Sequence, residues 1–262
     1  MGNKMQTNYI KARRSNLYIY QSVPLYYRAN GDKFGVYKPS GMNLKEMRVK
    51  KNLIPSELYL KKTDKAKGTR EVQKAFNKQL QSDLESNNQE NVKKTMVNLV
   101  DEMFSAPSSG VLVGLSNTVN IIVGDFIKDP EVIKNFWHLS DKDYTTALHS
   151  VNVMALAIRY AISRKFNKTS IKLLGLCALL HDVGKTKTDD DILTATRKLS
   201  DEEFAKIKFH PIQGYNLLKR CKFSNPEVKL TALQHHEKLD GSGYPNGLTR
   251  ISEFAKIISI LD

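Results

Sequence analysis

Short runs of apolar residues mark the first sixty positions of the chain as a region of β-strands. The runs cover residues 17–20, 23–27 and 34–37, and turn sequences follow at Asn30-Gly31-Asp32 and Pro39-Ser40-Gly41. Aromatic and β-branched runs bounded by Gly, Pro, Asn and Asp are typical of strands. The pattern predicts a small mixed α/β domain over residues 1–66.

The apolar spacing then widens to four residues. Val72, Phe76, Leu80 and Leu84 recur at this interval in a polar stretch that runs from about residue 68 to residue 103. The spacing predicts a long helix with a narrow apolar face, interrupted near Asn87-Asn88. We therefore expect residues 67–106 to form a helical linker.

Beyond residue 106 the pattern is that of helices throughout. Ser200 and Glu203 have the spacing of a capping box, and Asn225 before Pro226 is a typical helix start. The expected fold class is α+β overall. It combines an all-α helical bundle over residues 107–262, the helical linker and the small mixed α/β domain at the N-terminus.

Positive charge is concentrated in the first half of the chain. Residues 1–100 carry 20 Lys and Arg against 8 Asp and Glu, whereas residues 101–262 carry 21 against 19. A basic domain can meet nucleic acid, a membrane surface or an acidic partner, but such a bias is often only a solvated face. Because no nucleic-acid-reading motif accompanies the charge, we do not expect nucleic-acid binding.

The remaining composition points to a reducing compartment. Cys177 and Cys221 are too few for a disulfide framework, and Cys177 lies in an apolar run where a buried thiol is expected. The most apolar stretch, residues 110–127, contains five polar residues, so we expect no membrane span. No signal peptide is visible at the N-terminus. These features predict a cytoplasmic protein.

Candidate chemistry lies in the histidines, five of which fall between residues 149 and 236. They are embedded in two signatures, His-Asp-Val-Gly-Lys at residues 181–185 and His-His-Glu-Lys-Leu-Asp-Gly-Ser-Gly-Tyr-Pro at residues 235–245. Neutral imidazoles with nearby carboxylates are typical ligands of divalent metals. The sequence therefore predicts a metal-dependent hydrolase site.

Each ligand also has a structural alternative. His149 shares a helix face with Val153 and Leu156 over the expected helix 141–166, which on its own fits a core histidine. Adjacent helical residues diverge by about 100°, so His235 and His236 reach one site only near a helix end. Asp262 lies on an apolar face, where a buried carboxylate is costly unless it is paired or binds metal.

Taken together, residues 140–262 resemble the HD-GYP family, the bacterial hydrolases of cyclic di-GMP within the HD superfamily. The resemblance rests on both signatures, on His210-Pro211 followed by Gly214, and on Gly247-Leu248. It implies an HD-type helical bundle with two divalent metals, iron being the family-like choice and manganese or zinc the alternatives. The implied metal ligands are His149, His181, Asp182, His210, His235, His236 and Asp262, with Asp182 bridging.

The resemblance also implies how the reaction proceeds. A hydroxide bridging the two metals would attack cyclic di-GMP and give linear pGpG, with further hydrolysis to GMP as an option. Asp182 and Lys185 would be catalytic, with Lys185 steadying a phosphate oxygen. The implied substrate loop consists of Asp240, Gly241, Gly243, Tyr244 and Pro245.

Two departures from the family pattern leave alternatives open. Some members bind a third metal through a Glu four residues before the first histidine, where this chain has Thr145. Members also continue beyond the position of Asp262 with basic residues near the phosphates, so we expect the native chain to run on. A catalytically inactive receptor of cyclic di-GMP, or a module that docks a protein through the Gly-Tyr-Pro loop or the basic N-terminal domain, is the alternative. Hydrolysis of another nucleotide is the third reading.

Overall fold

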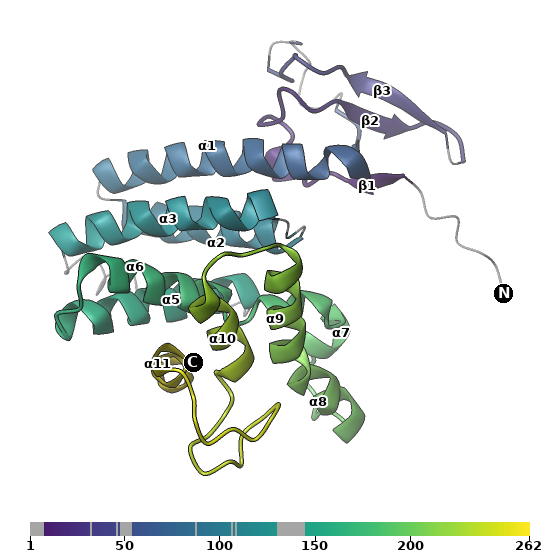
Figure 1. The fold of residues 1–262 in the computed structure, drawn as a ribbon. Coiled ribbons are helices and arrows are strands. Elements are labelled where there is room, and N and C mark those ends of the chain that lie inside the picture. The colour runs from purple at the N-terminus through teal and green to yellow at the C-terminus, as the bar shows by residue number, and fades with distance from the viewer. Residues whose placement is uncertain are drawn as a thin grey trace. The chain divides into compact units, whose positions relative to one another are not determined.

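The computed structural model describes residues 8–129 and 145–262, apart from residues 32, 46, 48–53, 87, 106 and 108. The chain divides into two compact units, Met1–Lys78 and Gln79–Asp262. The boundary falls inside helix α1 (Lys65–Glu85), which follows the short 3-10 helix η3 (Lys62–Asp64) (Figure 1). The division at residues 66 and 106 stays a prediction.

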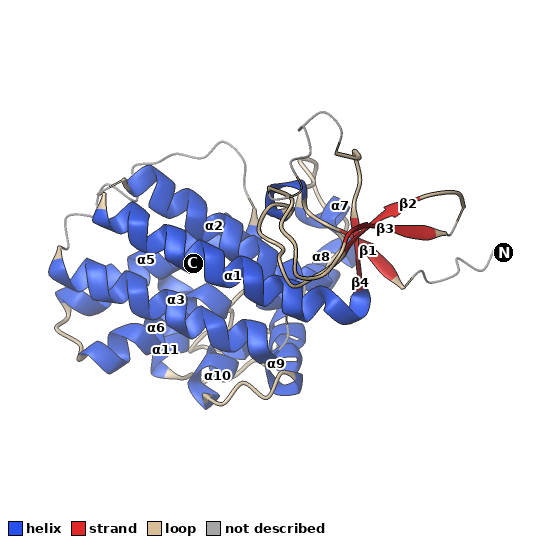
Figure 2. Ribbon diagram, turned by 90° about the horizontal axis from the view of Figure 1, so that it is seen from above, coloured by secondary structure: helices blue, strands red, loops and turns tan. Residues whose placement is uncertain are grey.

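The N-terminal unit is built on one antiparallel sheet. Its strands are β1 (Tyr9–Lys11), β2 (Leu25–Arg28), β3 (Phe34–Lys38) and β4 (Tyr59–Lys61), in the order β1-β4-β2-β3. All strands of the described chain lie in this unit (Figure 2). The predicted runs at 23–27 and 34–37 thus correspond to β2 and β3. The three-residue strands β1 and β4 are too short to show an alternating pattern.

The prediction of a strand at residues 17–20 is wrong. These residues follow the 3-10 helix η1 (Arg14–Asn16) and form turns and irregular backbone. Leu17 and Tyr20 are buried in the core beneath the sheet, together with Leu25, Leu60 and Val72 of α1. Their apolar character therefore reflects core filling rather than strand pairing.

Buried polar groups hold the N-terminal unit together. Lys38 is fully buried, and its ammonium donates to the carbonyls of Gln21, Pro39 and Met42 at 3.2, 3.1 and 2.9 Å. Burial lowers its pKa. The Glu71 carboxylate of α1 accepts from the backbone amides of Gln21 and Ser22. These contacts tie turns of the small unit to its helix.

The predicted interruption of the long helix is confirmed. Helix α1 ends at Glu85, and α2 (Gln89–Ser105) begins after Asn88, whose side chain accepts from the Asn91 amide. Asp83 near the end of α1 is buried and accepts from the Thr95 hydroxyl of α2 at 2.9 Å. This bond fastens the two helices at their turn.

Helices make up the rest of the described chain. The remaining elements are α3 (Ser109–Lys128), α5 (Thr146–Ser163), α6 (Lys168–Leu180), η4 (Val183–Lys187), α7 (Asp190–Leu193), α8 (Asp201–Lys208), α9 (His210–Arg220), α10 (Pro226–Gln234) and α11 (Glu253–Leu261). Helix α5 packs on α6, and α9 packs on both α10 and η4. The combination of a small sheet-containing part and a helical remainder is as expected.

Local start signals work as the sequence predicts. Ser200 and Glu203 form a reciprocal capping box at α8, and the Asn225 side chain caps α10 with Pro226 in its first turn. The apolar stretch at 110–127 lies within α3, where Leu115, Ile122 and Phe126 are fully buried. None of the helices in the described residues combines the length and apolar content needed to cross a bilayer.

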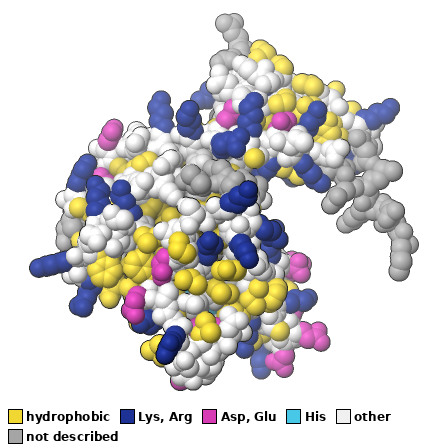
Figure 3. Space-filling view, in the orientation of Figure 1, with side chains coloured by type: hydrophobic (Ala, Val, Ile, Leu, Met, Phe, Trp, Pro, Cys, Tyr) yellow, Lys and Arg dark blue, Asp and Glu magenta, His cyan; other side chains and the backbone are white. Residues whose placement is uncertain are grey.

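Surface charge and cysteines add little chemistry. On the face shown in Figure 3, Lys and Arg side chains are scattered rather than gathered into one patch. Both cysteines are free, and Cys177 is buried as expected. Burial raises the pKa of its thiol to about 12, so Cys177 is an unreactive core residue.

Candidate metal centre

Helix ends bring the predicted ligands together. His149 lies in the first turn of α5, while His181, His235 and Asp262 are the C-terminal caps of α6, α10 and α11. His210 begins α9. The first part of the helix expected at 141–166 lies outside the described residues, and α5 starts at Thr146. The five elements thus converge through their termini, as the adjacent histidines at 235 and 236 require.

The ligands form two clusters that share one aspartate. The ligating atoms within each cluster all lie within 4.8 Å of one another. The deep cluster consists of Asp182, His210, His235 and His236, and the outer cluster consists of His149, His181, Asp182 and Asp262. All seven predicted metal ligands therefore meet in one place.

Backbone carbonyls fix the orientation of three histidines. In each case the Nδ1 atom donates to a carbonyl about one turn earlier in the chain. The bonds join His181 to Ala178 at 2.6 Å, His210 to Ile207 at 2.7 Å, and His235 to Thr231 and Ala232 at 3.1 Å. This assignment leaves Nε2 as the atom that carries the lone pair, which is the usual arrangement of a metal-binding imidazole.

The lone pairs of the deep cluster point at one another. His210 Nε2 and His235 Nε2 are 3.1 Å apart, and both rings are fully buried. Burial lowers the pKa of His235 to about 4 and, with the neighbouring imidazoles, that of His236 to about 3. Two neutral acceptors at this distance repel unless a cation lies between them. The donor set therefore fits a divalent metal.

Asp182 has the geometry of a bridging carboxylate. Its Oδ1 lies 3.1 Å from His210 Nε2, whereas its Oδ2 lies 3.5 Å from His149 Nε2 and 3.4 Å from His181 Nε2. Burial opposes its charge, but the surrounding imidazoles hold the pKa of Asp182 well below its usual value. Among the described residues, the buried Oδ1 accepts no hydrogen bond. A buried anionic oxygen without a donor is a position that a metal would satisfy.

The outer cluster is closed by Asp262. Its Oδ1 lies 2.6 Å from His149 Nε2 and 3.3 Å from His181 Nε2. Burial opposes charge on His181, but Asp182 and Asp262 outweigh it and raise the pKa of His181 to about 10. The two imidazoles, whose Nε2 atoms are 3.3 Å apart, therefore need a proton or a metal between them and the carboxylates.

Lys185 contacts the shared carboxylate directly. Its Nζ donates to Asp182 Oδ2 at 2.5 Å, and its side chain is 17% exposed. The ammonium is thus held at the mouth of the clusters and can reach an anionic group that approaches from solvent. Its catalytic role stays a prediction.

The Gly-Tyr-Pro segment lies against the deep cluster. The Tyr244 ring stacks on His236 with centroids 4.6 Å apart and an angle of 22°, and its backbone amide donates to the His236 carbonyl. Burial, followed by the charges of Asp182 and Asp262, raises the pKa of Tyr244 to about 12. Its hydroxyl is therefore a neutral donor beside the clusters.

Two other predicted loop residues shape the backbone. Asp240 is exposed, and its carboxylate accepts from the Ser242 amide and hydroxyl. Gly241 has a φ of +79°, which favours glycine. Neither residue belongs to a ligand cluster. Thr145, at the position where some members have a third ligand, caps α5 by accepting from the Leu148 amide.

Sequence reasoning missed two residues that support the site, Glu237 and Gly184, and it assigned Gly243 to the substrate loop without a packing role. Glu237 is buried, and its carboxylate accepts from the amides of Asn246 at 2.7 Å and Leu248 at 2.9 Å, which anchors the loop. A Cβ at Gly184 would lie 1.9 Å from the His210 carbonyl oxygen, and one at Gly243 would lie 2.3 Å from the Lys238 amide nitrogen. For Glu237 and Gly184, the available signal was a charged residue and a glycine inside the two signatures.

Comparison with known proteins agrees with this geometry. The family model described as HD domain matches residues 136–262. Cyclic di-GMP phosphodiesterase PA4108 of Pseudomonas aeruginosa is 35% identical over 56% of this chain and 36% of its own length. The Xanthomonas campestris cyclic di-GMP phosphodiesterase response regulator RpfG is 37% identical over 37% of this chain and 26% of its own length.

Two further relatives broaden the comparison. The 3'3'-cGAMP-specific phosphodiesterase 1 of Vibrio cholerae is 37% identical over 46% of this chain and 28% of its own length. The chain thus spans about a third or less of these curated relatives. The solved structure of Bd1817, an HDG"Y"P protein from Bdellovibrio bacteriovorus, matches with a TM-score of 0.60 and 21% identity over 97% of this chain and 86% of that one. This last likeness shows a shared fold. Residues 136–262 of the chain therefore carry the sequence of an HD domain.

Proposed function

We propose that the helical unit is a metal-dependent phosphodiesterase that opens cyclic di-GMP to linear pGpG. The observation that carries this proposal is Asp182, one carboxylate shared by two clusters of imidazole ligands. The names of the relatives from Pseudomonas and Xanthomonas supply the substrate. Loop residues 240–245 would line the substrate side of the site.

The chain's own residues define what such a site does. His149, His181 and Asp262 would hold one metal, His210, His235 and His236 the other, and Asp182 both. Two bound divalent ions, iron or manganese in our proposal, would supply Lewis acidity and water activation. Lys185 would hold a phosphate oxygen, and the Tyr244 hydroxyl would donate to a second one. Hydrolysis adds water across one P–O bond, and the leaving sugar oxygen receives a proton.

The test is turnover by the anaerobically purified, metal-loaded protein. We expect cyclic di-GMP to yield linear dinucleotide on chromatography, and the His235→Ala variant to lose one metal and all turnover. His138→Ala removes the one histidine of the sequence that is not a predicted ligand and is the matched control. Product formation by His235→Ala at the wild-type rate would contradict the proposal.

A second substrate belongs in the same assay. One relative is named for 3'3'-cGAMP, and a cyclic dinucleotide of either base composition presents the same phosphodiester. A higher kcat/KM for cyclic di-GMP than for 3'3'-cGAMP supports the proposal. A higher kcat/KM for 3'3'-cGAMP would instead make that dinucleotide the preferred substrate. Binding without hydrolysis by the two-metal protein would instead support the receptor role.

A further inference from the structure

Helix α8 carries a Lys and Phe pair that lies beside the metal centre. The Lys208 ammonium lies 4.9 Å from the centre of the Phe204 ring and 5.5 Å from the centre of the Tyr244 ring. Phe204 and Lys208 are four residues apart and so share one helix face. Because Tyr244 stacks on His236, a continuous series of contacts leads from a metal ligand to the exposed Phe204 ring.

We propose that Phe204 and Lys208 form the subsite for the second nucleotide of a cyclic dinucleotide, a proposal that rests on the proposed function. Phe204 stacks on the distal base, and Lys208 binds the phosphate that is not cleaved. Aromatic rings accept any base by stacking, and an ammonium beside such a ring binds phosphate as a point charge. The substrate class is therefore one with two phosphates and two bases.

Exposure and charge favour a ligand at this position. Phe204 is 48% exposed, so its ring is accessible to a base from solvent. Lys208 is exposed, and among the described residues its ammonium contacts the Phe204 and Tyr244 rings without forming an ion pair. An approaching phosphate would therefore meet an exposed cation that forms no ion pair with the described carboxylates.

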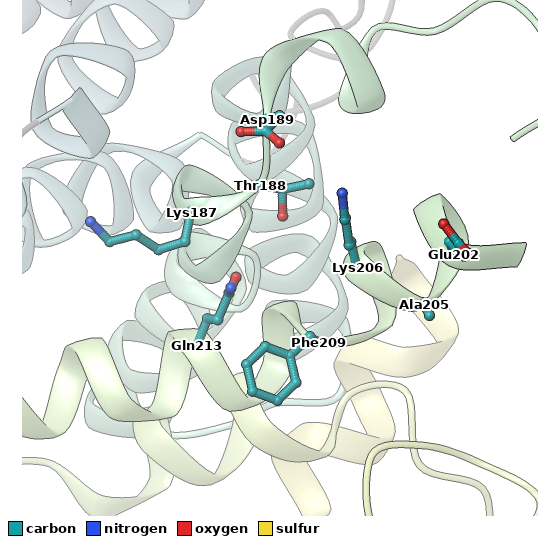
Figure 4. Close-up of a pocket in the computed structure, with 8 residues that line it drawn as sticks. All are labelled: Lys187, Thr188, Asp189, Glu202, Ala205, Lys206, Phe209 and Gln213. Carbon is teal, nitrogen blue, oxygen red and sulfur yellow. The ribbon is translucent and has the colours of Figure 1, made fainter. Parts of the chain in front are cut away.

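The opposite face of α8 supplies an internal control. Lys206 and Phe209 line a pocket of about 350 Å³ between α8, the start of α9 and the chain after η4 (Figure 4). Phe209 is 50% exposed, much like Phe204. This pocket also holds the carboxylates of Asp189 and Glu202, which disfavour a dianionic ligand. The same two residue types thus occur in an environment unsuited to phosphate.

The test compares the two pairs by steady-state kinetics with cyclic di-GMP. We expect Phe204→Ala and Lys208→Ala each to raise KM roughly tenfold while kcat changes less than about twofold. Lys208→Arg should restore most of the affinity, and raising the salt concentration should shrink the effect of Lys208→Ala. The control variants Phe209→Ala and Lys206→Ala should retain the wild-type KM.

Each outcome decides the proposal. Equal KM values for wild type, Phe204→Ala and Lys208→Ala overturn it, as does an equal rise in the two control variants. Wild-type hydrolysis of bis(p-nitrophenyl) phosphate without hydrolysis of dinucleotide would instead remove the proposed function. Calorimetric titration with cyclic di-GMP then tests the subsite alone. A roughly tenfold higher Kd in both α8 variants supports it, whereas unchanged Kd values or no binding overturn it.

Discussion

The deep and outer clusters use the same kinds of ligand but are built differently. His210 and His235 of the deep cluster are fully buried, and both are oriented by backbone carbonyls. The outer cluster has one histidine of this kind, His181, while its His149 is 14% exposed; His236 of the deep cluster is also partly exposed. A ligand that is buried and held in one orientation by hydrogen bonds binds its metal more tightly than one that is exposed to water. The deep cluster should therefore be the better metal site.

The Gly-Tyr-Pro loop adds to the difference between the deep and outer clusters. Glu237 directly follows the two histidines of the deep cluster and anchors the Gly-Tyr-Pro segment, so the loop and the deep cluster are one structural piece. The outer cluster instead joins α5, α6 and α11, whose ligands come from distant parts of the sequence. The deep cluster thus spans residues 182–236, whereas the outer cluster spans residues 149–262 and depends on contacts between more distant parts of the chain.

The largest effect is expected from removing the carboxylate that the clusters share. Asp182→Asn keeps the shape but not the charge, so both sites lose an anionic ligand. We expect metal content to fall from two equivalents to below one, and turnover of cyclic di-GMP to fall by more than about 10³-fold. Elemental analysis and product chromatography measure both. Two retained metals would show that the clusters do not depend on a bridge.

Graded removal of metal tests the difference between the clusters. With a limiting chelator we expect the wild-type protein to lose the outer metal first and to stop at one equivalent. His149→Ala should start from that one equivalent and keep it, because its deep cluster is intact. His235→Ala should instead release its remaining metal at lower chelator concentration. The reverse order of release in the two variants would contradict the assignment of the deep cluster as the tighter site.

A smaller effect is expected at Glu237. Glu237→Gln keeps one acceptor oxygen but loses the charge-assisted bonds to the loop amides, each of which contributes about 1.5–3 kcal/mol. We expect deep-cluster metal affinity to fall about tenfold, within the range known for residues that support ligands, while the outer cluster is unaffected. Competition titration with a metal indicator reports both sites. An equal loss at both would mean that the loop supports the whole bundle.

The sequence anticipated the clustering of the candidate ligands better than the strands of the small unit. All seven predicted ligands meet because residue type and spacing near helix ends constrain where histidines point. Residues 17–20 misled the strand prediction because burial beneath a sheet and pairing within it select the same apolar residues. Strands β1 and β4 are too short for any periodicity, and the buried Lys38 gives no local signal at all. Long-range contacts determine those features.

The residues that orient the ligands and the loop were harder to predict than the ligands themselves. Glu237 looks like an ordinary surface carboxylate in the sequence, since its two acceptor bonds form only when residues 246 and 248 return to it. The pairing of Lys208 with Tyr244 likewise joins α8 to a loop 36 positions later. A motif identifies groups that do chemistry, whereas the residues that orient them are fixed by the folded backbone.

The smallest predicted effect lies outside both clusters, in the cap of α8. Hydrogen bonds from the Arg197 guanidinium and the Ser200 amide lower the pKa of the partly exposed Glu203 carboxylate to about 2. A carboxylate whose folded pKa lies below its unfolded value of 4.5 stabilises the fold above that pH, and the gain disappears as the pH falls to about 2. Glu203→Gln should thus lower Tm slightly at pH 7, with a difference from wild type that shrinks below pH 4.5. Thermal unfolding of metal-free protein from pH 7 to pH 2.5 measures this difference. Because Glu203 belongs to neither cluster, metal loading should shift the Tm of both proteins equally; an unequal shift would show that the α8 cap and the metal centre are coupled.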